Sequence, residues 1–173
     1  MKPNSKFQIY TGDGKGKTTC AIGLAIRATG YDKQIVFIQF FKLKSGEDKI
    51  LKMQKNILFK KFGCKKFIIN KKILPEHKKQ AKKGIDFVLK ILNSNKKIDI
   101  LILDEINIVI YYNLASIKTI NEIINKCKQK NIELIFTGRN AKKAIIDKAD
   151  LVTEMKIIKH YFPETHARKG IEY

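Results

Sequence analysis

Residues 11–19 combine glycine, lysine and hydroxyl side chains in the order TGDGKGKTT. The glycines permit backbone angles that other residues avoid, so successive N–H groups can converge on phosphate oxygens. Lys17 offers an ammonium to the same oxygens, and the Thr18 hydroxyl is a ligand for Mg²⁺. We therefore predict a triphosphate-binding loop with contacts from consecutive residues: Gly12, Asp13, Gly14, Lys15, Gly16, Lys17, Thr18 and Thr19.

The general pattern for such a loop, GxxxxGK[ST], is matched only in its second half. The pattern places glycine five residues before Gly16, where this chain has Thr11. The flanking sequence nevertheless favours a phosphate loop over a glycine turn without a ligand. An apolar strand, Phe7–Thr11, precedes the loop and helical spacing follows over Lys17–Thr29. The start of that helix adds partial positive charge to the site.

Two carboxylates, Asp104 and Glu105, close the apolar segment IDILILDE. An acidic residue at the end of a neighbouring strand is the usual second part of a nucleotide site, where it reaches the metal. Helix capping or simple exposure is the alternative. We favour the metal role, so that Thr18, Asp104 and Glu105 are the predicted metal ligands.

A basic residue, Arg139, follows the next strand within the motif TGRN. Its position at a strand end makes it either a phosphate contact or a surface guanidinium, and both remain open. The histidines, at 77, 160 and 166, do not adjoin any of these loops in sequence, and no pair of nucleophile and base stands out. The sequence therefore offers no obvious group to deprotonate an oxygen nucleophile.

Apolar runs of strand length alternate with segments of helical period, which predicts an α/β fold. We expect one P-loop NTPase-type (RecA-like) domain over residues 1–173, with a mostly parallel sheet flanked by helices. The predicted strands are Phe7–Thr11, Gln34–Phe40, Ile57–Phe62, Ile98–Asp104, Glu133–Thr137 and Leu151–Lys156. The predicted helices are Lys17–Thr29, Pro75–Asn93, Leu114–Lys130 and Ala141–Lys148. The stretch from Lys42 to Lys72 is polar and poorly periodic.

The composition is strongly basic, with 36 Lys and Arg against 16 Asp and Glu and a net charge of +20. Such a charge favours either nucleic-acid binding or a solvated lysine-rich surface. The basic residues are mostly lysines spread over several segments, so we favour the solvated surface and do not expect nucleic acid as a partner. Three scattered cysteines argue against disulfides or a zinc site, and no segment has the length of a membrane span. We expect a cytoplasmic protein.

These motifs resemble those of one family, the P-loop corrinoid (cob(I)alamin) adenosyltransferases. That family's variant phosphate loop resembles TGDGKGKTT, including a first position that is not glycine. Further matching segments run in order along nearly the whole chain: Arg27, IQFFK (Ile38–Lys42), SGE (Ser45–Glu47), LDEIN (Leu103–Asn107), TGRNA (Thr137–Ala141) and the C-terminal LVTEMKIIKHYF and GIEY.

The resemblance implies a reaction and a role for several residues. The family transfers the 5′-deoxyadenosyl group of ATP to cobalt(I) of a corrinoid and releases triphosphate, in the formation of adenosylcobalamin. By resemblance Lys17 binds the triphosphate, Thr18 and Glu105 hold Mg²⁺ with Asp104 beside them, and Arg27 is a further nucleotide contact. Cobalt(I) carries no proton, so the reaction needs alignment and a stabilised leaving group rather than a base.

Two features depart from the better-known members. Those members have an extension before the first strand that helps to cover the corrinoid, whereas here the strand begins at Phe7. They also have two aromatic residues that displace the corrinoid's lower ligand; this chain offers Phe67, and Phe62 as a second candidate, at different spacing. Core packing is the alternative for either side chain. The resemblance further implies a homodimer and an electron-donor flavoprotein that reduces cobalt.

Two other functions remain as hypotheses. A nucleoside or nucleotide kinase also combines a P-loop with acidic residues at a strand end, although the scattered cysteines cannot build the zinc lobe of thymidine kinases. A basic, ATP-dependent nucleic-acid-binding module would account for the charge. We favour the adenosyltransferase, because the motifs occur together and in order.

Overall fold

A computed structural model describes residues 4–42, 45–64, 68 and 72–172 of the chain. Its centre is a six-stranded sheet in the order β3-β2-β4-β5-β1-β6, in which every pair of neighbours is parallel. The strands are β1 Phe7–Thr11, β2 Ile35–Phe40, β3 Ile57–Phe62, β4 Ile100–Asp104, β5 Glu133–Thr137 and β6 Leu151–Glu154. The predicted α/β class is confirmed, and each predicted strand is present with ends that differ by two residues at most.

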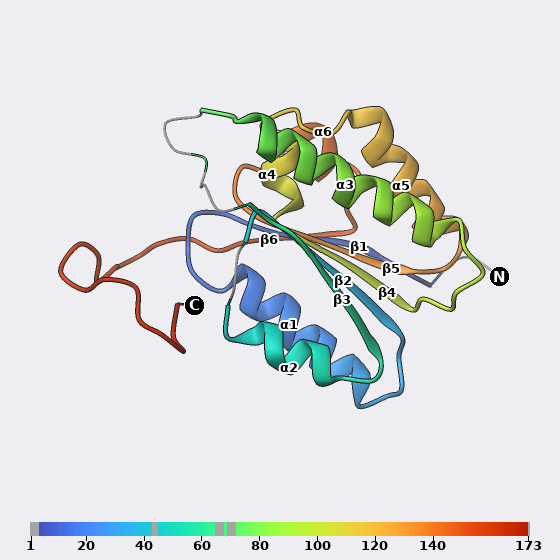
Figure 1. The fold of residues 1–173 in the computed structure, drawn as a ribbon, viewed down its shortest axis with the longest axis horizontal. Coiled ribbons are helices and arrows are strands. Elements are labelled where there is room, and N and C mark those ends of the chain that lie inside the picture. Colours follow the sequence, from blue (N-terminus) through green and yellow to red (C-terminus); the bar gives the residue numbers. More distant parts are fainter. Residues whose placement is uncertain (1–3, 43–44, 65–67, 69–71, 173) are drawn as a thin grey trace.

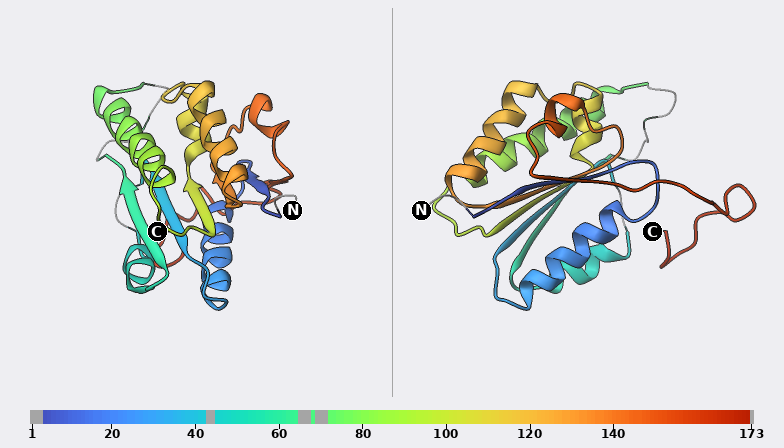
Figure 2. Two further views of the ribbon diagram at one scale, coloured as in Figure 1. Left: turned by 90° about the vertical axis from the view of Figure 1, so that its right-hand side faces the viewer. Right: turned by 180° about the vertical axis from the view of Figure 1, so that it is seen from behind.

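Helices cover both faces of this sheet (Figure 1). They are α1 Lys17–Thr29, α2 Glu47–Met53, α3 Pro75–Leu92, α4 Ile106–Tyr111, α5 Ile117–Gln129 and α6 Lys143–Ile146. The helices α1 and α2 lie on one face, and the other four lie on the opposite face, as the turned views also show (Figure 2). The four predicted helices are present, whereas α2 and α4 were not predicted.

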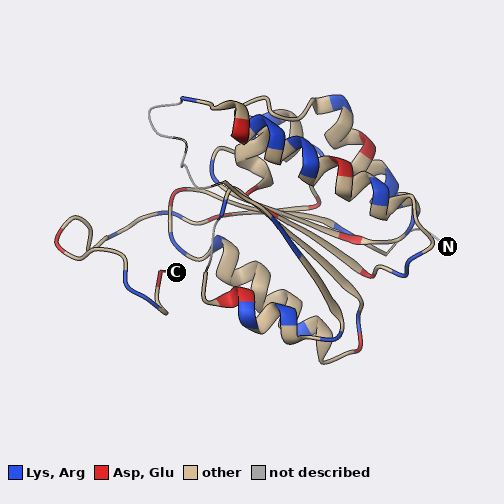
Figure 3. Cartoon of the chain, viewed as in Figure 1, with Lys and Arg blue, Asp and Glu red and all other residues tan. Residues whose placement is uncertain are grey.

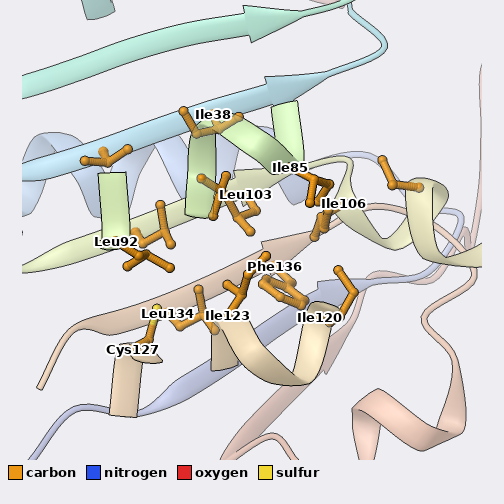
Figure 4. Close-up of a cluster of buried hydrophobic side chains, with 14 of the residues drawn as sticks. Ile38, Ile85, Leu92, Leu103, Ile106, Ile120, Ile123, Cys127, Leu134 and Phe136 are labelled. Atoms are coloured by element: carbon orange, nitrogen blue, oxygen red, sulfur yellow. The ribbon is translucent and has the colours of Figure 1, made fainter. Parts of the chain in front are cut away.

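Two apolar clusters fill the spaces between the layers. The larger one joins α3, α4, α5 and α6 to the sheet through side chains such as Leu103, Ile123 and Phe136 (Figure 4). In the smaller one, Ala21 and Ala25 of α1 pack on the opposite face. Each residue of β4 is buried, because this central strand has a helical layer on both sides. Burial on both faces makes β4 a rigid support for the residues that follow it.

Lys and Arg residues occur in both helical layers of the described part of the chain (Figure 3). Helix α3 carries several lysines at exposed positions, while its opposite side contributes Ala81, Ile85, Val88 and Leu92 to the core. No described helix has the length and apolar character needed to cross a bilayer. The lysines of α3 therefore belong to the polar side of an amphipathic helix.

The parallel arrangement brings the carboxyl ends of all six strands to one edge of the sheet. The segments after β1, β2, β4, β5 and β6 consequently meet there, although they lie far apart in the sequence. Ligand sites of open α/β sheets form at this edge.

A tight contact behind this edge gives a test of the fold. A Cβ atom added to Gly84 of α3 would lie 2.3 Å from Cε1 of Phe40, whose ring is buried at the end of β2. We expect Gly84→Ala to lower the free energy of unfolding by about 1–3 kcal/mol, since the ring has to move within a packed core. Urea unfolding followed by circular dichroism measures the change.

The matched control is Gly23→Ala on the exposed side of α1, where an added Cβ meets nothing within 4 Å. There the higher helix propensity of alanine should raise stability by about 0.5–1 kcal/mol. Equal effects of the two substitutions would contradict the described packing of α3.

Candidate nucleotide and metal site

A cleft of about 780 Å³ lies at the carboxyl edge of the sheet. Its walls come from the loop after β1, from the segment around α2, and from the C-terminal segment that follows β6. Predicted site residues among its lining are Asp13, Gly14, Lys15, Gly16, Lys17, Thr18, Thr19, Glu105 and Arg139. The structure thus brings together most of the residues that were predicted from separate parts of the sequence.

The glycine-rich loop is shaped by its own backbone and by β6. Gly12 and Gly16 have φ angles of 94° and 118°, a region that only glycine adopts without strain. The chain after β6 also passes so close that a Cβ added to Gly12 or Gly14 would lie 2.5 or 2.6 Å from the carbonyl oxygen of Met155. Gly14 N–H donates to that oxygen at 2.7 Å. The glycines are therefore required for packing as well as for approach to phosphate.

Lys17 is the first residue of α1 and is only 8% exposed. Its Nζ donates to the carbonyl oxygen of Gly14 at 2.6 Å, so the ammonium is held beneath the loop. Burial lowers the pKa of Lys17, while the nearby carboxylate of Glu105 acts in the opposite direction. A cation held in partly dry surroundings interacts strongly with an arriving anion.

Asp104 is fully buried at the end of β4 and accepts hydrogen bonds from four side chains. Its Oδ1 accepts from Thr18 Oγ1 at 2.9 Å and from Thr137 Oγ1 at 2.5 Å. Its Oδ2 accepts from Gln39 Nε2 at 2.8 Å and from Lys42 Nζ at 3.1 Å. We call these five residues the Asp104 cluster. It fixes the hydroxyl of Thr18 relative to the sheet.

Glu105 lies beside this cluster but faces the cleft. Its backbone has a φ of 63°, and its N–H donates to Thr137 Oγ1 at 3.0 Å. Gly138 packs against it, since an added Cβ there would lie 3.1 Å from Glu105 Oε2. The side chain is 21% exposed. Burial, and next the negative charge of Asp104, raise the pKa of Glu105.

The oxygens of Thr18, Asp104 and Glu105 suit a hard cation such as Mg²⁺. Within the described ranges no three His, Cys, Asp or Glu side chains gather as metal ligands. Mg²⁺ keeps waters and takes phosphate oxygens from its substrate, so one hydroxyl and two carboxylates are a donor set that fits this ion. In the structure the ammonium of Lys42 lies among the same oxygens, 2.5 Å from Thr18 Oγ1 and 4.0 Å from Glu105 Oε1.

The two predicted arginine contacts have different positions. Arg139 lies beside the loop, with Nε 3.6 Å from Asp13 Oδ1 and a second contact to the carbonyl oxygen of Asp13 at 3.4 Å. Arg27 lies in the last turn of α1 and is not among the residues that line the cleft. A rise of about 1.5 Å per residue places it roughly 15 Å along the helix from Lys17. The structure does not bring Arg27 to the cleft, and its nucleotide role stays a prediction.

Phe67 and Phe62 were the two aromatic residues considered as contacts of the corrinoid. Phe67 lies outside the described residues. Phe62 packs against Phe40 and Phe87, with ring centroids 6.4 and 5.8 Å away. Phe62 is thus part of the packing at the end of β3.

Sequence reasoning did not identify the C-terminal wall of the cleft. His160, Tyr161 and Glu172 line it. They belong to the C-terminal segments LVTEMKIIKHYF and GIEY of the resemblance, but no role in the site was predicted for them. Glu172 Oε1 lies 2.9 Å from Nζ of Lys15 and also accepts from Tyr161. Hydrogen bonds from Arg168, and next from Tyr161 and Lys15, lower the pKa of Glu172. Lys15 therefore links the loop to the C-terminal segment in this structure.

The pKa of Glu105 leads to a stability prediction. Because the folded protein holds the proton more tightly than the unfolded chain, ionisation of Glu105 destabilises the fold. This loss of folding stability is absent below the ordinary glutamate pKa, and it grows as the pH rises toward the raised pKa of Glu105 in the folded state. We expect Glu105→Gln to be more stable than the parent at pH 8 without divalent ions, and about equally stable at pH 4.

Urea unfolding with EDTA at both pH values checks this, with the exposed Glu164→Gln as the control. A Glu105→Gln variant less stable than the parent at pH 8 would contradict the described burial of the carboxylate.

Comparisons with known proteins agree with this geometry. The family model described as "ATP:corrinoid adenosyltransferase BtuR/CobO/CobP" matches residues 4–173. A corrinoid adenosyltransferase of Sinorhizobium sp. is 28% identical over 95% of this chain and 78% of its own length. Those of Escherichia coli K12 and Salmonella typhimurium LT2 are 29% and 27% identical, each over 95% of this chain and 84% of the relative. The chain belongs to the ATP:corrinoid adenosyltransferase family of enzymes.

Proposed function

We propose that the chain transfers the 5′-deoxyadenosyl group of ATP to cobalt(I) of a corrinoid and releases triphosphate, in the biosynthesis or salvage of adenosylcobalamin. The electron pair of cobalt(I) forms the bond to C5′, and the pair of the C5′–O bond leaves with the triphosphate. Family membership supports this reaction. The observation that carries the proposal is the concentration of positive charge around the glycine loop.

Cationic side chains face the predicted triphosphate position from three segments. Lys17 is held beneath the loop, Arg139 lies against Asp13, and Lys42 lines the same cleft. Since negative charge develops on the departing triphosphate, fixed cations favour the transition state over the bound substrate. These residues bind and orient an anion and need not accept a proton.

Thr18 and Glu105, with Asp104 behind them, would hold Mg²⁺, which supplies further positive charge to the departing triphosphate. The Asp104 cluster orients the Thr18 hydroxyl for this purpose through hydrogen bonds from α1, β2 and β5. When the triphosphate is held in this way, C5′ of the ribose points toward the second substrate, as displacement at that carbon requires.

The cleft also has apolar walls next to the charged loop. Ile22, Ile50 and Ile171 line it together with the loop residues. Such side chains suit the adenosine part of ATP, since ligand pockets combine apolar walls with a few polar groups. We further propose that the chain acts as a homodimer and that an electron-donor flavoprotein reduces the cobalt of its corrinoid, as the resemblance implies.

The direct test combines the protein with ATP, Mg²⁺ and chemically reduced cobalamin, and follows the absorption of cobalt(I). We expect a cobalt–carbon bond to form while ATP is consumed. The same reaction with cob(I)yrinic acid a,c-diamide compares a biosynthetic precursor with the complete corrinoid. Consumption of ATP to phosphate or pyrophosphate without a cobalt–carbon bond would refute the proposal.

Lys17→Ala tests the leaving-group argument. We expect turnover to fall by at least about 100-fold, because the substitution removes a buried cation from the departing anion. The circular dichroism spectrum should not change. Lys52→Ala, on the exposed side of α2, is the control and should keep full activity. Near-normal turnover of Lys17→Ala would show that the leaving group is stabilised elsewhere.

A further inference from the structure

Lys42 has a fixed backbone position just after β2. Phe41 before it has a φ of 56°, and the N–H of Lys42 donates back to the carbonyl oxygen of Phe40 at 2.7 Å. On the other side, a Cβ added to Gly63 would lie 2.0 Å from the carbonyl oxygen of Lys42. This close packing fixes the turn and directs the side chain into the cleft, where Lys42 is part of the lining.

The ammonium of Lys42 lies among the oxygens that we assign to Mg²⁺. It donates to Thr18 Oγ1 at 2.5 Å and to Asp104 Oδ2 at 3.1 Å, and it lies 4.0 Å from Glu105 Oε1. The side chain is 30% exposed while that of Asp104 is fully buried. One positive charge thus compensates two adjacent carboxylates that would otherwise repel each other.

The hydroxyl of Thr18 shows why the ammonium and a metal ion exclude each other. Its proton goes to Asp104, and its oxygen accepts from Lys42. A metal ion takes an electron pair of that same oxygen and leaves the hydrogen bond to Asp104 in place. A divalent ion at these oxygens would also lie within a few ångströms of the ammonium, where like charges repel strongly.

Asp104 can lose Lys42 without becoming unpaired. Its Oδ2 still accepts from Gln39 Nε2 at 2.8 Å, and its Oδ1 still accepts from Thr18 and Thr137. The ammonium can therefore move when a better acceptor enters the cleft. A triphosphate is such an acceptor, since it carries several negative oxygens into the space that Lys42 already lines.

We propose that Lys42 is a positioning residue that holds the metal-binding oxygens in the nucleotide-free protein and keeps a divalent ion out until the triphosphate arrives. This inference rests on the proposed metal role of Thr18, Asp104 and Glu105. Its consequence is an order of binding: the metal ion enters together with ATP, and the ammonium of Lys42 then moves from the carboxylates to the phosphate oxygens.

The test measures Mn²⁺ binding to the nucleotide-free protein through the electron paramagnetic resonance signal of free Mn²⁺. We expect Lys42→Met to bind Mn²⁺ at least about tenfold more tightly than the parent protein, because the competing charge is gone. Lys42→Arg keeps a charge and should bind as weakly as the parent. Lys60→Met, at an exposed position of β3, should also match the parent.

Thermal unfolding gives a second readout. In EDTA, Lys42→Met should melt at a lower temperature than the parent, and Mn²⁺ should restore it, because the metal replaces the lost cation. Lys42→Gln repeats both measurements with a different neutral side chain. Unchanged or weaker Mn²⁺ binding by both neutral variants would overturn the inference, as would equally tight binding by Lys42→Arg.

The same titration with ATP present, after subtraction of the Mn²⁺ that ATP alone chelates, separates this inference from the proposed function. If the parent protein binds Mn²⁺ with ATP, and the neutral variants gain no affinity without it, only the role of Lys42 is wrong. If the parent protein fails to bind Mn²⁺ even with ATP, the metal role of Thr18, Asp104 and Glu105 is wrong, and the inference is overturned with it.

Discussion

The buried carboxylate of Asp104 is the constraint on which the site depends. An ionised carboxylate without partners is very costly inside a protein. Here four donors surround it, from α1, from β2 and the residue two positions after it, and from β5. These donors can meet the carboxylate only when the sheet has its observed order, with β4 between β2 and β5. Satisfying one buried group thus aligns three separate segments.

The parts of the site that face the cleft are arranged around this buried group. Thr18 lines the cleft, and its hydroxyl donates a hydrogen bond to Asp104. The backbone of Glu105 is held by the same Thr137 hydroxyl that donates to Asp104. A further hydrogen bond, from Asn107 Nδ2 to the carbonyl oxygen of Gly138 at 3.0 Å, joins the first turn of α4 to the turn after β5. The groups proposed to bind the metal and the phosphates therefore rest on rigid elements.

The sequence predicts those elements whose local pattern agrees with their tertiary surroundings. β1, β3, β5 and α1 have the predicted ends, because apolar strands and the glycine loop are marked locally. Helix α4 was missed because its sequence INIVIY continues the apolar run of β4 with β-branched residues, which favour strands. Helix α2 has only seven residues with Leu51 as its buried one, too short a pattern to show helical period.

The motif residues of the candidate site could be predicted from the sequence. The side chains that form hydrogen bonds with them could not. Asp104 ends an otherwise apolar strand and Glu105 follows it, so their place at the carboxyl ends of the strands can be predicted from the sequence. Gln39 and Lys42 belong to the segment IQFFK of the resemblance, but a Gln within a strand and a Lys just after it are usually exposed to solvent, so their contact with Asp104 could not be predicted. Their contact with Asp104 follows from the pairing of β2 with β4, which places Gln39 beside Asp104. His160 and the rest of the C-terminal wall belong to segments that the resemblance matched, but their residue types gave no sign of a place in the site.

The measurement that tests the central claim most directly is ATP binding to Thr137→Val, with and without Mg²⁺. Thr137 is fully buried, and among the described residues its hydroxyl contacts Asp104 and the backbone of Glu105, whereas Thr137→Ser keeps the hydroxyl. The account predicts that Thr137→Val binds ATP about tenfold more weakly with Mg²⁺ and nearly normally in EDTA, and that Thr137→Ser resembles the parent protein. Unchanged affinity of Thr137→Val in the presence of Mg²⁺ would contradict it.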